Sequence, residues 1–188
     1  MKIYKILNDF ENYLSFTIDN GELFSKMPFF SAKFKACSRL GEWVKPNGVF
    51  YQSDNYTANN MCLPSITTWL LGNLILNEIA YINLKPFLDD YGEFLETSCE
   101  GVTYYIFNCL NILPDYLIDE DMTKEKTVSG VYMGLESLAF NNFNKNEYIV
   151  FKTNADKLSH LYCTELFVDL INENGFKGLV FSEDLSSV

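Results

Sequence analysis

The sequence has a single histidine, and this scarcity limits the chemistry open to it. No second imidazole completes a usual zinc set, and neither a Cys-x-x-Cys pair nor a Gly-x-x-x-x-Gly-Lys phosphate loop occurs. His160 and Cys163 could serve as base and nucleophile only on a helix, because residues three apart on a strand point to opposite faces. We therefore expect no catalytic residue, no metal and no cofactor.

Positive charge is also scarce. Lys and Arg number 14 against 25 Asp and Glu, which gives a net charge of −11. This charge repels phosphate backbones and attracts basic partners. We expect no binding to nucleic acid.

Long hydrophobic runs are missing as well. The longest candidate, Trp69 to Leu84, is interrupted by Gly72, Asn73, Asn77, Glu78 and Asn83, so we expect no membrane span and no membrane partner. Met1 to Leu7 alternates apolar and polar residues and lacks the apolar core of a signal peptide. We expect a cytoplasmic protein whose five cysteines are reduced and buried. Its oligomeric state stays open.

Apolar residues, by contrast, are plentiful. Hydrophobic residues make up 48% and aromatic residues 16% of the 188 positions. A chain of this size and composition buries enough surface to fold without disulfides or metals. We predict one globular domain over residues 1–188, with an irregular N-terminal part up to residue 60 that contains a β-hairpin.

The clearest local pattern lies between Tyr162 and Phe181. Thr164 is placed to cap a helix, whose side chains Leu166, Phe167, Leu170 and Ile171 share one face that we expect to be buried. Gly175 supplies the left-handed residue that ends the helix, and Phe176 is placed to fold back over the last turn. Short strands are predicted on either side, at 147–152 and 178–181.

Two segments of the chain resemble an immunity-protein family of bacterial polymorphic toxin and contact-dependent inhibition systems. One consists of Ile149 to Lys152 and Cys163 to Phe181, with a Phe-centred strand, a capped helix and a closing Gly-x-x-Gly-aliphatic-x-Phe strand. The other, Gly101 to Leu113, is similar to an aromatic strand that leads into an acidic linker. The resemblance covers about residues 90–183. It implies a protein that binds and neutralises a cognate toxin domain, with no catalysis of its own.

The remaining elements follow from alternation and turn residues. We predict a hairpin of strands 2–7 and 13–18, a turn at Asn20-Gly21, a helix over 66–76 and an end to any preceding helix at Pro86. A second hairpin is predicted from strands 93–99 and 102–107. An acidic loop then covers 114–127 and a strand covers 131–133. Together these elements predict an α+β fold, with a mixed or mainly antiparallel sheet packed against two or three helices.

Two acidic clusters, each with a tyrosine, are the candidate partner-binding sites. The general reading of such runs is a solvated loop, and carboxylates two apart could also hold magnesium. Tyrosines, however, are common interface anchors, and acids speed association with a basic partner. The candidate residues are Asp89, Asp90, Tyr91 and Glu93 in the first cluster, and Asp115, Tyr116, Asp119, Glu120 and Asp121 in the second.

Stoichiometric inhibition of a basic toxin is the function we expect, and two alternatives stay open. One is a generic or self-associating binding module. The other is an enzyme whose site lies in residues 20–60. The aromatic side chains of the predicted strands could line a ligand pocket, although large rings at alternating positions are more typical of a core.

Overall fold

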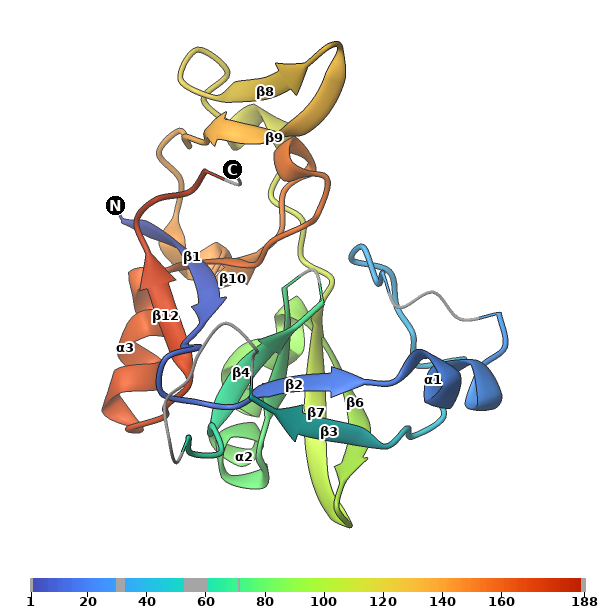
Figure 1. Ribbon diagram of the computed structural model, residues 1–188. Coiled ribbons are helices and arrows are strands. Elements are labelled where there is room, and N and C mark those ends of the chain that lie inside the picture. The colour runs from blue at the N-terminus through green and yellow to red at the C-terminus, as the bar shows by residue number, and fades with distance from the viewer. Residues whose placement is uncertain (1, 30–32, 53–60, 71, 187–188) are drawn as a thin grey trace.

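The computed structural model describes residues 2–29, 33–52, 61–70 and 72–186, and its body contains two four-stranded antiparallel sheets (Figure 1). The first sheet has the order β10-β11-β1-β12. Its strands are β1 (Ile3–Asn8), β10 (Val150–Phe151), β11 (Tyr162–Thr164) and β12 (Leu179–Ser182). The N-terminal strand β1 thus lies between strands from the C-terminal unit and completes their sheet.

The second sheet has the order β4-β5-β7-β6 and is buried on both faces. Its strands are β4 (Ile66–Trp69), β5 (Asn73–Leu76), β6 (Gly92–Cys99) and β7 (Val102–Cys109). Leu74 and Phe107 face one core while their neighbours Ile75 and Ile106 face another. This double burial explains the unbroken apolar run in β5.

Two further pairs of strands complete the strand content of the described chain. They are β2 (Ser15–Ile18) with β3 (Gly48–Tyr51), and β8 (Lys124–Val128) with β9 (Val131–Ser137). The β8–β9 hairpin projects from one end of the molecule (Figure 1). Ser129 and Gly130 both have positive φ, as the tight turn between twisted strands requires.

Three α-helices occur in the described residues: α1 (Asn20–Lys26), α2 (Glu78–Leu88) and α3 (Glu165–Glu173). Side chains cap α1 and α2, because Asp19 accepts from the backbone of Gly21 and Glu22, and Asn77 accepts from Ala80. Thr164 occupies the N-cap position of α3 as predicted, but its buried hydroxyl makes no capping hydrogen bond. The other end of α3 is as the sequence predicts. Gly175 has φ +67°, and Phe176 folds back so that its N–H donates to the carbonyl of Ile171 at 3.0 Å.

Three hydrophobic cores separate the layers. The first is shared by both four-stranded sheets and the inner faces of α2 and α3, and it includes Ile6, Leu84 and Phe167. The second lies between the other face of the β4-β5-β7-β6 sheet and the β2–β3 pair with α1. The third joins Phe151 and Tyr162 of the first sheet to the segment that carries the β8–β9 hairpin. The α+β class with antiparallel sheets is therefore confirmed.

Several predicted elements are wrong in their pairing or type. The strands near 2–7 and 13–18 exist, but they do not form a hairpin: β1 pairs with β11 and β12, while β2 pairs with β3. The predicted turn at Asn20-Gly21 is the start of α1, because Asp19 supplies its cap. The hairpin across Glu100-Gly101 and the strand at 131–133 are confirmed as β6–β7 and part of β9.

The predicted helix over 66–76 is instead the β4–β5 hairpin. Leu70 and Gly72 have φ of 28° and 71°, which reverses the chain between the two strands. Pro86, which was predicted to end a helix, lies inside the last turns of α2. Proline has no N–H, so the carbonyl of Ile82 has no intrahelical donor. Ile82 is 61% exposed, so this carbonyl lies on a face of α2 where water can donate to it instead.

The predicted acidic loop over 114–127 contains a short 3-10 turn at its start and most of β8 at its end. The cysteine prediction is right for Cys99, Cys109 and Cys163, which are buried. It is wrong for Cys37 and Cys62, which are exposed.

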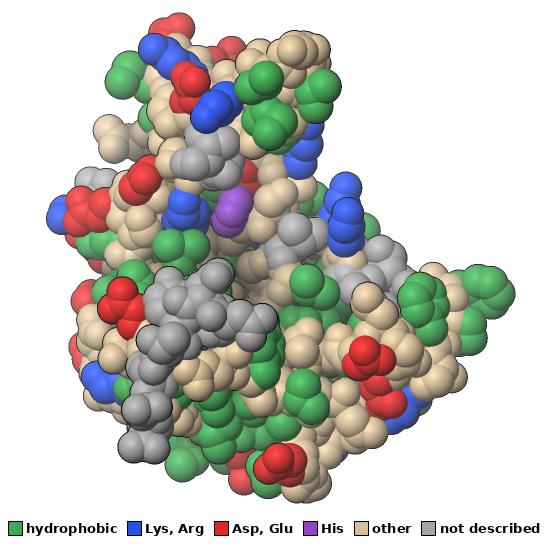
Figure 2. Space-filling model, viewed as in Figure 1, with side chains coloured by type: hydrophobic (Ala, Val, Ile, Leu, Met, Phe, Trp, Pro, Cys, Tyr) green, Lys and Arg blue, Asp and Glu red, His purple; other side chains and the backbone are tan. Residues whose placement is uncertain are grey.

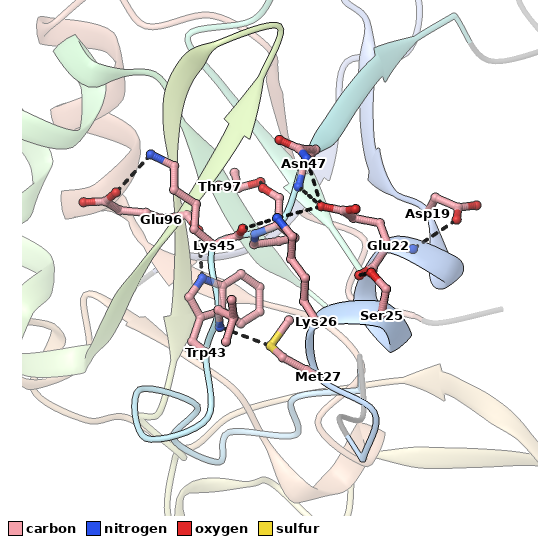
Figure 3. Close-up of polar contacts among 12 residues, drawn as sticks. Asp19, Glu22, Ser25, Lys26, Met27, Trp43, Lys45, Asn47, Glu96 and Thr97 are labelled. Atoms are coloured by element: carbon pink, nitrogen blue, oxygen red, sulfur yellow. Dashed lines mark hydrogen bonds and ion pairs between the residues drawn. The ribbon is translucent and has the colours of Figure 1, made fainter.

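A network of polar contacts joins parts of the N-terminal segment to one another and to β6 (Figure 3). Glu22 of α1 accepts from the backbone and side-chain nitrogens of Asn47 at 2.7 and 3.0 Å. Trp43 donates its indole N–H to the carbonyl of Glu96 at 2.7 Å. Lys26 reaches back from α1 to the carbonyl of Lys45, also at 2.7 Å. The segment that the sequence left least defined is thus fixed by long-range bonds.

None of the helices in the described part of the chain has both the length and the hydropathy of a transmembrane span.

Candidate protein-binding surface

The second acidic cluster forms one continuous surface, which we call the acidic surface: Asp115, Tyr116, Asp119, Glu120 and Asp121. Apolar neighbours hold it in place, because Leu117 and Ile118 are buried in the third core. The side-chain amide of Asn141 donates to the carbonyls of Tyr116 and Ile118 at 3.1 and 3.2 Å. The acidic loop is therefore fixed at its base.

Two shallow depressions, of about 330 and 300 Å³, lie on the acidic surface. Glu120 borders both of them. Tyr116, Asp119 and Asp121 line the first, and Asp115 lines the second. No Lys, Arg or His is among their described lining residues, so every charged side chain that lines them is acidic.

Within the acidic surface, the side chains differ in how tightly they are held. Asp119 accepts from the N–H of Met122 at 3.1 Å, and Asp115 accepts from the amide of Asn154 at 3.1 Å. Tyr116 is 77% exposed. A large aromatic ring projecting among carboxylates is the combination that an interface with a basic protein uses.

The surface lies directly before the β8–β9 hairpin in the sequence. In Figure 2 the projecting end that carries this hairpin shows acidic, basic and hydrophobic side chains close together. The five residues of β8 are all exposed, and two of them are Lys124 and Lys126. The hairpin thus carries charges of both signs, whereas the charged residues of the acidic surface are all acids.

The first predicted cluster is not a second surface of the same kind. Asp89 is paired with Lys85 at 2.7 Å, whereas Asp90 is exposed. The Tyr91 hydroxyl donates to the carbonyl of Asn146 at 3.0 Å, and its ring packs against the first core. Burial raises the pKa of this phenol. Tyr91 is thus held by the protein itself.

Glu93 lies inside the molecule, contrary to its place among the candidate surface residues. Its side chain is buried at 6% exposure. The carboxylate accepts from the Ser38 hydroxyl and the Arg39 N–H, both at 2.6 Å, and from the Asn108 amide at 2.8 Å. Glu93 therefore ties the loop around residue 38 to the β6–β7 hairpin. Its side chain is not available to a partner.

His160 and Cys163, the residues considered as a dyad, have separate surroundings. His160 Nδ1 lies 2.9 Å from a carboxylate oxygen of Asp156. Cys163 is fully buried in β11 against the first core, where desolvation raises the pKa of its thiol well above the ordinary value. A protonated buried thiol is a poor nucleophile.

No pattern in the sequence indicates the buried polar cluster around Asp156, which is 2% exposed. This carboxylate accepts from the Tyr162 hydroxyl at 2.9 Å and from two backbone N–H groups, those of Ser159 and His160. Lys152 is fully buried near Cys109 and Asp156, and desolvation lowers the pKa of its amine. Nothing in the sequence around Lys152, which follows Phe151, distinguishes it from a surface lysine.

No three His, Cys, Asp or Glu side chains are arranged as a metal-binding group in the described ranges. Comparison of the chain with protein-family models and with curated proteins finds no match.

Proposed function

We propose that this chain is an immunity protein that binds a cognate bacterial toxin domain in the cytoplasm and neutralises it by occupying or distorting the toxin's active site. The observation that carries the proposal is the acidic surface: four acids that the sequence singles out lie together, on a fixed loop, around the exposed Tyr116. The likeness of residues 90–183 to immunity proteins of polymorphic toxin systems adds to it.

The mechanism is stoichiometric binding. The net charge of −11 attracts a basic toxin domain, such as a nuclease, over distances longer than a contact. Tyr116 then loses its exposed area to the interface, where buried tyrosines contribute more binding energy than most residues. No bond is made or broken, so one molecule of this protein inhibits one molecule of toxin.

Co-expression tests the proposal. Cells that produce the toxin domain of the large protein encoded next to this chain should survive only when this chain is produced as well. Tyr116→Ala combined with Glu120→Lys should reduce protection at least about tenfold, since it removes the aromatic anchor and reverses a charge between the two depressions.

A matched control is Tyr51→Ala, which removes a tyrosine that is 44% exposed on β3, outside the acidic surface. This variant should protect as well as the wild type. Failure of the wild-type chain to rescue cells, or the absence of any toxin domain encoded beside it, would overturn the proposal. A stable homo-oligomer that ignores the neighbouring gene product would favour the self-associating module instead.

A further inference from the structure

A second surface, on the side of the molecule formed by α2 and α3, combines apolar side chains with unpaired acids. A groove of about 340 Å³ is lined by Phe87 of α2, by Ile149, and by Leu166, Asp169, Leu170 and Glu173 of α3. We call it the α2–α3 groove. All its lining residues belong to well-packed elements or to the segment that leads into β10.

The groove exists because α3 has two apolar rows where the sequence predicted one buried face. Phe167 and Ile171 are buried in the first core, at 0% and 2% exposure. Leu166 and Leu170, one residue earlier in each turn, are only half-buried. On the other wall, Phe87 is 45% exposed. Apolar side chains therefore line both walls of a surface that the chain itself leaves open.

Two carboxylates stand beside the apolar row. Asp169 and Glu173 are four apart on α3 and both exposed. Their carboxylates make no ion pair or hydrogen bond with other described residues. No Lys, Arg or His is among the groove's described lining residues. The groove is thus apolar along its length and negative at its edge.

We propose that the α2–α3 groove binds a protein segment that carries one or two large apolar side chains flanked by Lys or Arg. Charge complementarity selects this occupant. A second copy of the chain would bring a net charge of −11 against the two acids, and anionic lipid or nucleic acid would be repelled in the same way. A basic segment gains from both features, since its apolar side chains fill the groove and its cations meet Asp169 and Glu173.

We further propose that in the cell the segment bound in the groove belongs to the toxin, and only this part of the inference depends on the proposed function. Binding to the groove itself is tested without the toxin. A displayed library of random 12-residue peptides is sorted for binding to the wild-type chain and against the double variant Asp169→Lys/Glu173→Lys, whose exposed positions tolerate the change.

Enriched peptides should contain Leu, Ile, Phe or Trp between Lys or Arg residues. A synthetic peptide of that sequence should bind the wild type at least about tenfold more tightly than the double variant, because two attractive contacts become repulsive. It should also shift the amide NMR signals of Phe87, Ile149 and Leu170. Leu166→Ala, which shortens one groove wall and leaves the rim charges in place, should weaken the same peptide by a similar factor.

The inference would be overturned if the library yields no enriched peptide, if the enriched peptides are acidic, or if they bind the wild type and the double variant equally. So would a concentration-dependent dimer that the double variant abolishes, because the groove would then belong to self-association. If the groove peptides bind but the chain rescues no cell, the proposed function fails alone. If the chain rescues cells and no groove-dependent peptide emerges, the groove inference fails alone.

Discussion

The carboxylate of Asp156 holds the loop before β11 in shape. Four donors converge on it: the N–H of Ser159, the N–H and Nδ1 of His160, and the hydroxyl of Tyr162. At 2% exposure the carboxylate is almost out of contact with solvent. Asp156→Ala should therefore lower the free energy of unfolding by about 3 kcal/mol or more, as measured by urea denaturation, because several buried donors lose their acceptor.

Tyr162→Phe is the matched control for that change. It removes one donor and leaves three on the carboxylate, so it should cost about 1 kcal/mol. Equal losses for the two variants would show that the Tyr162 hydroxyl bond accounts for the whole contribution of the carboxylate, and that its three other donors add nothing.

Buried ionisable groups give the protein a specific pH dependence. Desolvation raises the pKa of the Cys109 thiol from 9.0 to about 12, and burial also raises the pKa of Cys163 and Tyr162. Such groups stay protonated in the folded chain after they ionise in the unfolded chain. Their contribution to stability is therefore complete below pH 9 and is lost as the pH rises toward 12.

Lys152 acts in the opposite sense, because its pKa is lowered and its contribution to stability rises with pH up to the ordinary lysine value of 10.5. The groups with raised pKa outnumber it, so the free energy of unfolding should fall above pH 9. In reducing buffer, Cys109→Ala should make this fall shallower by roughly 1 kcal/mol per pH unit, since one proton fewer is released on unfolding. An unchanged slope would contradict the raised pKa of Cys109.

Glu93 is a residue whose burial its neighbours in the sequence do not reveal. Beside Asp89 and Asp90 it reads as one more surface acid. Its partners Ser38 and Arg39, however, lie 55 and 54 positions earlier in the chain. Its alternation with buried Leu95 is the one local hint of its position.

At the scale of elements, the two glycines that follow α3, Gly175 and Gly178, differ in how much space surrounds them. Gly175 has φ +67°, and a methyl group added there would meet nothing within 4 Å. Gly178 has φ +113°, and a methyl group there would overlap the carbonyl oxygen of Ile66 and the ring of Pro64. Gly175→Ala should therefore cost about 1 to 2 kcal/mol of unfolding free energy, which is the backbone penalty alone. Gly178→Ala should cost at least about 3 kcal/mol, because a steric clash adds to the backbone penalty.

Thermal and urea unfolding of the two variants check this difference. Equal losses would mean that β4 and the 177–178 segment separate easily, against the bonds that the N–H groups of Ser65 and Ile66 donate to the carbonyl of Lys177 at 2.9 and 3.1 Å.

Elements were predictable where a local signal decides them. α3, with its glycine stop at Gly175, and the β6–β7 hairpin follow from turn residues and periodicity, although the Thr164 side chain makes no capping hydrogen bond. The 66–76 segment was misassigned because both faces of the β4–β5 hairpin are buried, so its apolar residues show no alternation. The β1–β2 hairpin failed for another reason. Alternation identifies a strand, but partners more than 150 residues away in β11 and β12 are beyond a local pattern.

The two candidate binding surfaces differ in the same way, because one is formed by neighbours in the sequence and the other is not. Asp115, Tyr116, Asp119, Glu120 and Asp121 lie within seven positions, so a single loop brings them together and the sequence could predict it. The α2–α3 groove needs a residue from each of three distant segments. No spacing in the sequence connects Phe87 to Leu166.

At the scale of the whole molecule, most of the charge lies outside the packed interior. Three cores take up apolar side chains of both four-stranded sheets, and apart from buried groups such as Glu93, Lys152 and Asp156 the charged side chains that make up the net charge of −11 lie mainly at the surface. Association with a basic toxin should therefore be fast at low salt. It should slow as salt increases, because exposed charges are screened over about 8 to 10 Å at physiological ionic strength.

The position of the charge, and not only its sum, should set that rate. The triple variant Asp119→Asn/Glu120→Gln/Asp121→Asn removes three negative charges from the acidic surface. The association rate constant, measured by stopped flow at low salt, should fall about tenfold, with a smaller change in the dissociation rate. The control Glu11→Gln/Glu78→Gln/Glu183→Gln changes the net charge equally at exposed positions elsewhere. If both triple variants slow association equally, the toxin is attracted by the molecule's total charge and the acidic surface does not orient it. If neither variant responds to salt, apolar contact governs the encounter, and the α2–α3 groove becomes the surface to examine first.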